Sequence, residues 1–285
     1  MAQAATDGNE GFGTRTMVRS TISLIRRELA AYFWSPVAYV VIGVFLLALG
    51  LLFHFTLQLL TARGPIGIEY PMLGLFGNVG FWLIFWIIPP MLTMRLFAEE
   101  RSTGTLEMLL TAPVRDGQVV LCKFIACWIF YLFLLAPTLL YLWVLLNVHA
   151  GNPNSRWPFG LSFGVDPWPA VTSYLGLVLA GAMFLSIGMW ISSLVRSQIV
   201  AAMATLGLSL VFLLGGFLIL GGFLSPPADS GEWSYRVLEF ISVPLHFTRD
   251  FCRGLVDSRH LVLYVTVALA CLFLSMKALE SRQWK

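Results

Sequence analysis

The sequence predicts an all-α, polytopic membrane protein with six transmembrane helices. Of its 285 residues, 58% are hydrophobic and 12% are charged, whereas an ordinary soluble domain carries about 25% charged residues. The mean hydropathy is +0.80. Long apolar runs recur along the chain, each with the roughly 20 residues that a helix needs to cross a bilayer core. The alternating pattern of membrane-barrel strands is not seen.

The six spans are expected at about 37–60, 74–97, 119–146, 170–194, 199–224 and 259–279. With both termini inside, the inner segments carry twelve lysines and arginines and the outer segments carry six. Because cytoplasmic loops of membrane proteins are enriched in these residues, we expect both termini in the cytosol.

The segment before the first span has a pattern of its own. Residues 1–16 are polar and glycine-rich, which predicts a disordered cytosolic tail, and residues 17–285 are expected to form one transmembrane domain. From residue 17 to the Ser35-Pro36 break, apolar residues recur at helical spacing and arginines lie away from them. This pattern predicts an amphipathic helix in the cytoplasmic interface. The alternative is a basic flank that only orients the first span. The residues concerned include Arg19, Ile22, Arg26, Arg27 and Leu29.

The segment 225–258 is expected on the outer side. Apolar residues at helical spacing are interrupted by Pro244. They predict two short amphipathic pieces, hinged at this proline, that rest on or dip into the outer leaflet. A small extracellular cap helix explains the pattern equally well.

The spans lack the chemistry of several classes of membrane protein. Ion-coupled carriers need ionisable residues at depth, but His54 and Lys123 are the nearest candidates and both read as interfacial. There is no HExxH metal motif and no P-loop. Glu99-Glu100 could begin an intramembrane protease motif, EExxxR, but Gly104 stands where its arginine belongs. We therefore expect no catalytic, cofactor or metal site in the chain, and a net charge of +3 does not suggest nucleic-acid binding.

Small residues repeat at intervals of four in two spans. Such stripes let helices approach closely. They predict either tight packing within one bundle or packing against a second copy. The residues are Gly176 and Ala180 in the fourth span, and Ala201, Thr205 and Ser209 in the fifth.

A compact charged insert, FAEERSTGTLEMLLTAPVR at residues 97–115, separates the second and third spans. Gly104 can end one helix, and Thr105 is a good N-cap for the next, with Glu107 in its first turn. Pro113 disfavours helix at the residue before it. The resulting helix is too short to be stable alone in water. We expect it to be held by the neighbouring spans or by a cytosolic partner.

The insert and the start of the third span, FAEERSTGTLEMLLTAPVRDGQVVLCKFIA, resemble the region after the second span in permeases of type-2 ABC exporters. RRELAAYFWSPVAYVV and FTRDFCRGLVDSRHLVLYV extend the resemblance over nearly the whole chain, and the closest subgroup is the gliding-motility-type (GldF-like) permeases. In that family the insert forms a coupling helix that docks on an ATPase subunit. Cys122 and His260 depart from the family pattern. The resemblance implies docking by Glu99, Glu100, Arg101, Gly104, Thr105, Leu106, Glu107, Leu110 and Pro113.

The resemblance implies a permease subunit that couples ATP hydrolysis by a separate cytosolic ATPase to export or extracytoplasmic work. ATP and Mg would be bound by that partner and the chain would not itself be an enzyme. Further expected partners are a second permease copy or a homologous permease, the lipid bilayer of the bacterial cytoplasmic membrane, and no nucleic acid. A membrane-anchored extracytoplasmic subunit on 225–258 stays open. The alternative function is a membrane anchor that drives an extracytoplasmic partner without moving a substrate.

Overall fold

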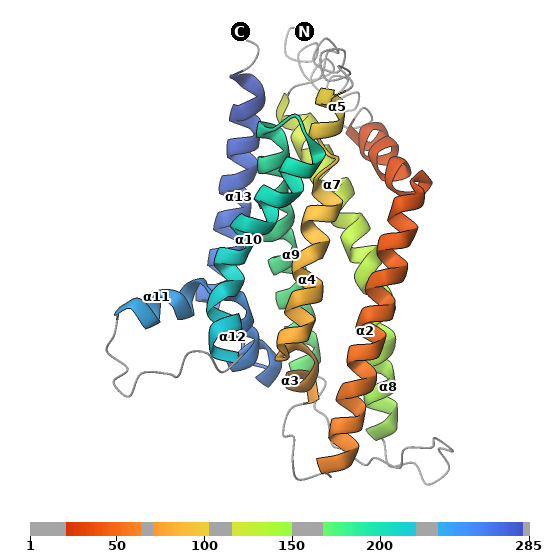
Figure 1. Cartoon of the computed structure of the whole chain (residues 1–285), viewed down its shortest axis with the longest axis vertical. Coiled ribbons are helices and arrows are strands. Elements are labelled where there is room, and N and C mark those ends of the chain that lie inside the picture. Colours follow the sequence, from red (N-terminus) through yellow and green to blue (C-terminus); the bar gives the residue numbers. More distant parts are fainter. Residues whose placement is uncertain (1–20, 64–70, 103–115, 150–167, 221–232, 282–285) are drawn as a thin grey trace, which may run out of the picture.

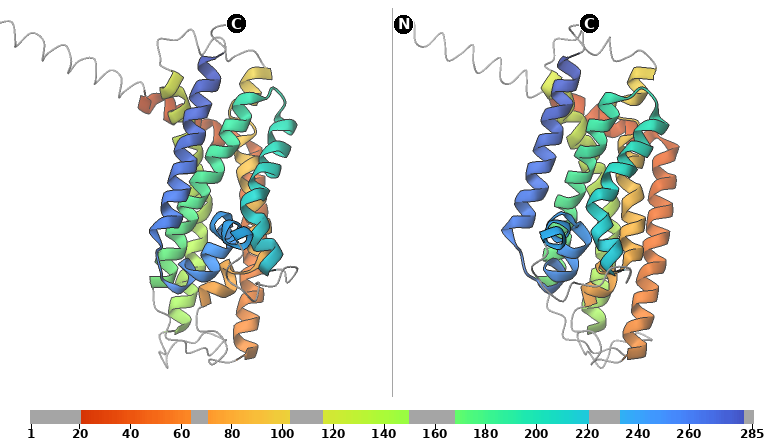
Figure 2. Two further views of the ribbon diagram at one scale, coloured as in Figure 1. Left: turned by 90° about the vertical axis from the view of Figure 1, so that its left-hand side faces the viewer. Right: turned by 60° about the vertical axis from the view of Figure 1, so that its left-hand side comes forward.

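The computed structural model describes residues 21–63, 71–102, 116–149, 168–220 and 233–281, and its regular elements are helices. The long helices run roughly along one axis (Figures 1 and 2). A helix of residues 21–34, here the N-terminal helix, lies at the same end of the bundle as α5 (Ala98–Ser102) and the last turn of α13 (Ser258–Glu280). We call this the α5 end. The short helices α3 (Pro71–Phe76) and α12 (Val243–Arg249) mark the opposite, α12 end.

Six helical stretches in the described part of the chain are long and apolar enough to cross a membrane, as the sequence predicted. They belong to α2 (Pro36–Arg63), α4 (Val79–Thr93) with its extension through α5, α7 (Asp116–Leu135) with α8 (Leu139–His149), α9 (Trp168–Leu194), α10 (Gln198–Leu220) and α13. Their apolar extents are Ala38–Gln58, Val79–Arg101, Gly117–Val144, Trp168–Leu194, Gln198–Ile219 and Ser258–Glu280.

The second span begins later than predicted. Residues 71–76 form the separate helix α3, and α4 starts only at Val79. The reason is local, because the Asn78 side chain accepts a hydrogen bond from the Gly80 amide at 2.8 Å and caps α4. Trp82 then donates its indole N–H to the Phe76 carbonyl at 2.8 Å, which ties the two helices together.

The third span is also divided. The 3₁₀ turn η1 (Ala136–Thr138) separates α7 from α8. Pro137 has no N–H to continue the α-helix. Two hydroxyl groups donate hydrogen bonds to backbone carbonyls at the break. The Thr138 hydroxyl donates to the Leu135 carbonyl at 2.6 Å, and the Tyr174 hydroxyl of α9 donates to the Thr138 carbonyl at 2.8 Å. The break is therefore stabilised by a neighbouring helix.

The central helix of the bundle is α9, which is buried along most of its length. Its small residues allow aromatic rings to lie directly against its backbone. The ring of Tyr131 occupies the space that a side chain at Gly181 would need, and its hydroxyl donates to the Leu177 carbonyl at 2.9 Å. Phe251 packs on Gly176 in the same way.

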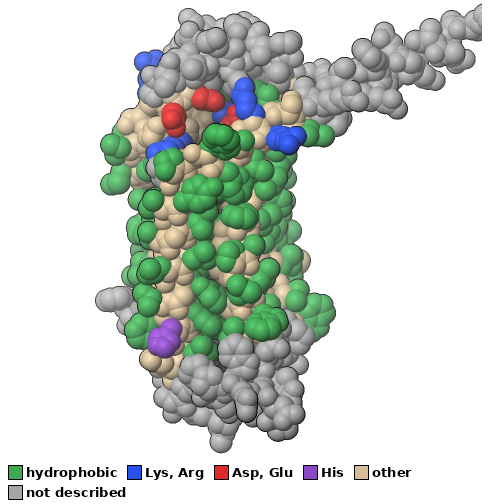
Figure 3. Space-filling view, turned by 90° about the vertical axis from the view of Figure 1, so that its right-hand side faces the viewer, with side chains coloured by type: hydrophobic (Ala, Val, Ile, Leu, Met, Phe, Trp, Pro, Cys, Tyr) green, Lys and Arg blue, Asp and Glu red, His purple; other side chains and the backbone are tan. Residues whose placement is uncertain are grey.

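The outer helices turn large hydrophobic side chains away from the bundle. Figure 3 shows one such face, where hydrophobic side chains cover the middle and charged side chains gather toward the α5 end. This distribution is typical of a protein that spans a bilayer. The outward residues include Val44, Leu47 and Leu51 of α2, Met203 and Val211 of α10, and Val262 and Leu269 of α13.

The outer segment differs from the prediction in one of its two pieces. α11 (Trp233–Ile241) exposes Trp233, Val237 and Phe240, as expected of an amphipathic piece at the surface. α12 is instead buried in the bundle. The break lies at Ser242 rather than at Pro244, which occupies the first turn of α12. The prediction of a second surface piece was wrong, because aromatic packing of the bundle encloses α12.

Candidate functional site

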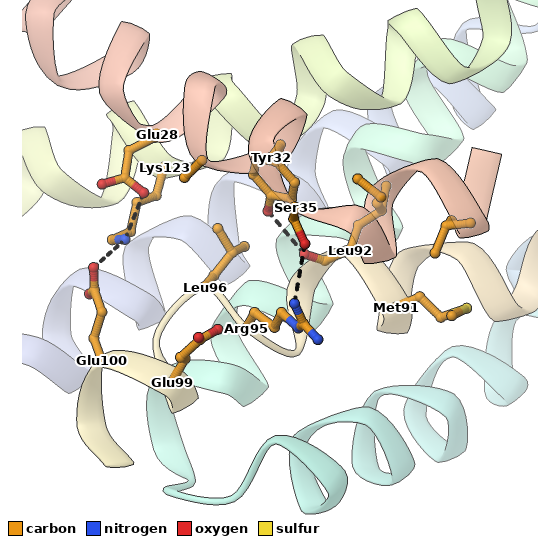
Figure 4. A pocket seen from close by; sticks show the side chains of 13 residues that line it. Glu28, Tyr32, Ser35, Met91, Leu92, Arg95, Leu96, Glu99, Glu100 and Lys123 are labelled. Carbon is orange, nitrogen blue, oxygen red and sulfur yellow. Dashed lines mark hydrogen bonds and ion pairs between the residues drawn. The ribbon is translucent and has the colours of Figure 1, made fainter. Parts of the chain in front are cut away.

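The site centres on a buried lysine at the α5 end. Lys123 lies in the second turn of α7, and 3% of its side chain is exposed. Its Nζ donates to Glu28 Oε2 at 2.9 Å and to Glu100 Oε1 at 2.7 Å (Figure 4). The ion-pair centre, meaning Glu28, Lys123 and Glu100, therefore joins the N-terminal helix, α7 and α5. Lys123 was predicted to be interfacial; it lies at the charged α5 end of the bundle, where surrounding protein buries its side chain.

Mutual neutralisation makes this burial possible. An ammonium group is expensive to bury alone but tolerable when paired and hydrogen-bonded. Burial acts to raise the pKa of Glu28, but Lys123, with help from Arg27, outweighs burial and the net pKa is lowered. The buried ring of Phe97 adds a further favourable contact, with its centroid 5.6 Å from the lysine Nζ.

α5 is also fastened to the end of α9. Ser192 Oγ accepts hydrogen bonds from the backbone amides of Phe97 and Ala98, both at 3.2 Å. Arg101 donates to the carbonyl of Ser193 and, at 3.3 Å, to that of Val195. The cationic side chain thus meets the negative end of a long helix dipole. Direct contacts to α7 and to the end of α9 consequently hold this five-residue helix, and Lys123 links it indirectly to the N-terminal helix.

Beside the ion-pair centre lies a cavity of about 440 Å³. The N-terminal helix and the start of α2 form one side, and the end of α4 and α5 form the other (Figure 4). Tyr32 bridges the two sides by donating to the Leu92 carbonyl at 2.9 Å. Arg95 and Glu99 also line this space. The cavity thus combines cationic, anionic and apolar walls.

Of the four charged residues predicted to dock on a partner, the three that the structure describes have different positions. Glu99 is exposed, whereas Glu100 and Arg101 are half-buried and directed toward α7 and α9 by the contacts above. The rest of the predicted docking set lies outside the described residues. That set comprises Gly104, Thr105, Leu106, Glu107, Leu110 and Pro113.

The N-terminal helix packs on protein as well as presenting a basic side. Arg26 and Arg27 are exposed, as expected, but so is Ile22. Leu29 packs partly on the core, and the Tyr32 ring stacks on Phe130 with centroids 5.1 Å apart. The apolar stripe therefore continues onto α7 near the Ser35 break. Arg19 lies outside the described residues.

The small-residue stripes lie inside one bundle. Ser209 accepts a hydrogen bond from the Trp86 indole N–H at 2.8 Å, and Thr205 faces Gly188 of α9. These contacts join α10 to α4 and α9 within the same chain. All five predicted residues are buried: Gly176, Ala180, Ala201, Thr205 and Ser209.

A second polar cluster, which sequence patterns did not predict, lies at the α12 end. The rings of His246 and His260 stack with centroids 3.7 Å apart. The two carbonyls of Glu239 and Phe240 lie 3.1 Å from His246 Nε2, so this nitrogen donates and Nδ1 accepts from the Tyr264 hydroxyl at 2.9 Å. Burial, together with the neighbouring His260, lowers the pKa of His246 to about 3.

His260 Nε2 lies 2.9 Å from Asp250 Oδ2, so the histidine that departs from the family pattern still contacts an acidic residue. No group of three or more His, Cys, Asp or Glu side chains within the described ranges is arranged to hold a metal ion.

Six apolar helices in the described part of the chain, packed into one bundle with charged side chains gathered toward one end, define a multi-pass α-helical membrane protein. Its particular family is given by sequence comparison: residues 73–243 match the ABC-2 family transporter proteins. The chain belongs to this family, and it is a permease-type membrane domain of an ABC transporter. Membership implies an ABC ATPase partner. A search of curated proteins finds no match.

Proposed function

We propose that the chain is the permease subunit through which a separate cytosolic ABC ATPase drives export or extracytoplasmic work. The α5 end would face the cytosol and the α12 end the outside. The gathering of Arg26, Arg27, Arg95, Arg101 and Lys123 at the α5 end supports this orientation. A GldF-like relationship belongs to the same proposal.

One observation carries the proposal: α5, which directly precedes the coupling segment implied by the resemblance, is bonded to α7 and to the end of α9, and through Lys123 to the N-terminal helix. Glu100 joins it to Lys123, which in turn binds Glu28. The Ser192 hydroxyl accepts from the backbone amides at its start, and the carbonyls of Ser193 and Val195 accept from Arg101. Charge-assisted hydrogen bonds are short and strong. A displacement of the coupling segment would therefore move the N-terminal helix, α7 and α9 together.

The transporter would contain two such permeases, identical or homologous. The outward apolar side chains of α10 offer a surface for the second one. α11, with its exposed Trp233, offers a surface for an extracytoplasmic subunit or for lipid. Either arrangement is compatible with the mechanical role of α5.

The experiment is co-expression of the chain with candidate ABC ATPase subunits from the same genome, followed by co-purification and an ATPase assay in lipid nanodiscs. Glu99→Lys should weaken co-purification, because Glu99 is exposed at the predicted docking segment. Arg196→Glu is the matched control, since Arg196 is exposed on the turn between α9 and α10.

Lys123→Met should leave co-purification intact but reduce the stimulation of ATPase activity by the permease, since it breaks the connection between α5 and α7. If no ATPase co-purifies with the unmodified chain, or if Glu99→Lys and Lys123→Met both behave like the control, the proposed coupling role is wrong. Substrate movement in proteoliposomes then separates export from the anchoring alternative.

A further inference from the structure

The cavity at the α5 end has an unusual polar group in its wall. Among the described residues, the buried Nε of Arg95 has no hydrogen-bond partner, and its Nη1 makes a long contact, 3.4 Å, to Ser35 Oγ. In the described part of the chain no carboxylate oxygen lies within 4.0 Å of this guanidinium. A buried donor without an acceptor is unfavourable. The planar guanidinium is the protein group best shaped to bind a phosphate.

Near Arg95 the cavity is lined by apolar side chains and by the carboxylate of Glu99, while Lys123 in the same lining is already paired with Glu28 and Glu100. Ala38 and Val41 of α2 and Met91 of α4 supply apolar lining. Glu99 stands beside Arg95 (Figure 4). Met91 and Glu99 are exposed, so the cavity reaches the surface of the molecule. A ligand complementary to this lining would carry an anionic group to meet Arg95, a cationic group next to it to meet Glu99, and an apolar chain.

We propose that this cavity binds a phospholipid of the adjoining leaflet whose headgroup is phosphoethanolamine. Its phosphate would accept hydrogen bonds from Arg95 and Ser35, its ammonium group would donate to Glu99, and an acyl chain would lie between Val41 and Met91. The inference goes beyond the proposed function, since it concerns a lipid site in the permease alone and requires neither an ATPase nor transport.

The test is native mass spectrometry of the purified full chain in detergent, titrated with phosphatidylethanolamine, phosphatidylglycerol and phosphatidylcholine of identical acyl chains. One phosphatidylethanolamine should be retained in preference to the other two lipids. Arg95→Gln should weaken its binding about tenfold or more, as loss of a charge-assisted hydrogen bond predicts. Arg196→Gln removes the same charge from an exposed position and should leave binding unchanged.

Two further variants examine the other walls. Glu99→Gln should abolish the preference for phosphatidylethanolamine over phosphatidylglycerol. Ala38→Leu should exclude the acyl chain and weaken the binding of all three lipids. Inorganic phosphate and free phosphoethanolamine are added as competitors at millimolar concentration. Neither should displace the lipid, because neither fills the apolar wall.

Several results would overturn the inference. Equal binding of the three lipids, or binding unaffected by Arg95→Gln in a folded variant, would exclude headgroup recognition here. Displacement by inorganic phosphate would identify a free-anion site instead of a lipid site. Because no ATPase is present, failure of this test leaves the coupling role untouched, and failure of coupling leaves this test untouched.

Discussion

The ammonium nitrogen of Lys123 lies 2.7 Å from a carboxylate oxygen of Glu100, and this contact joins the second turn of α7 to α5. The same nitrogen binds Glu28, 95 positions away in the chain. The three helices at the α5 end therefore share one buried cation. A displacement of α5 would therefore be transmitted to the N-terminal helix through two consecutive ion pairs.

Lys123→Met should destabilise the protein by about 3 kcal/mol, because it leaves two partly buried carboxylates without their cation. Lys277→Met is the matched control, since 56% of the Lys277 side chain is exposed, and it should change stability by less than about 0.5 kcal/mol. Thermal unfolding in detergent measures both. The triple variant with Glu28→Gln and Glu100→Gln should recover part of the loss. Equal melting temperatures for the two lysine variants would contradict a structural role for the ion-pair centre.

The contribution of Glu28 to the stability of the folded protein should depend on pH in a defined direction. Burial opposes ionisation of Glu28, but Lys123 outweighs it, so its folded-state pKa lies below the ordinary value of 4.5. A depressed carboxyl pKa stabilises the folded state above the ordinary pKa, and the stabilisation is lost as pH falls below it. The stability difference between the unmodified protein and Glu28→Gln should thus be largest near pH 7 and shrink below about pH 4.5. A difference that stays constant down to about pH 3.5 would refute this assignment.

His246 should make the stability of the folded protein sensitive to acid at a higher pH than Glu28 does. Its pKa falls from 6.5 to about 3 in the folded state, so only the unfolded chain takes up this proton between those values. The contribution of neutral His246 to stability is therefore fully present above pH 6.5. It falls as pH drops below that value, by about 2 kcal/mol at pH 5.

His246→Gln should remove that part of the pH dependence, whatever its effect on stability at neutral pH. His54→Gln is the control, because His54 is exposed on α2. The measurement is the difference in melting temperature between about pH 7.5 and about pH 5. If both variants show the same change in melting temperature with pH as the unmodified protein, protonation of His246 does not cause the loss of stability in acid.

Gly181→Ala should destabilise the bundle by about 1–3 kcal/mol, because its Cβ would overlap the ring of Tyr131. Gly207→Ala introduces the same methyl group on α10, where, apart from the neighbouring backbone of the helix itself, no atom of the described residues lies within 4 Å. It should be neutral or should stabilise by up to about 1 kcal/mol through helix propensity. Melting temperatures of the two variants give the comparison, and a Gly181→Ala protein as stable as Gly207→Ala would show that the Tyr131 ring can move aside.

Much of the architecture could be predicted because its causes are local. The six membrane spans arise from runs of apolar residues, and the N-terminal helix ends at Ser35-Pro36. Local capping was also readable in principle: Asn78 separates α3 from α4 by binding the Gly80 amide. Pro137 likewise divides α7 from α8.

The candidate site could be predicted only in part. The charged insert drew attention to Glu99, Glu100 and Arg101, but nothing near them in sequence indicates that Glu100 faces Lys123 or that Arg101 faces the end of α9. One signal was present for Lys123, since a lysine at the start of a long apolar run needs a partner if it is buried. Its partners could not be named, because they lie on separate helices.

The sequence by itself determined that this chain is an all-helical membrane protein with six spans, because the free energy of placing a residue in a bilayer depends on that residue and its near neighbours. Only the tertiary structure decided which polar groups are buried together. The ion-pair centre, the stacked histidines and the burial of α12 depend on contacts between distant helices. In a medium where an unpaired charge is so unfavourable, those contacts decide whether a charged side chain lies inside the protein or at its surface.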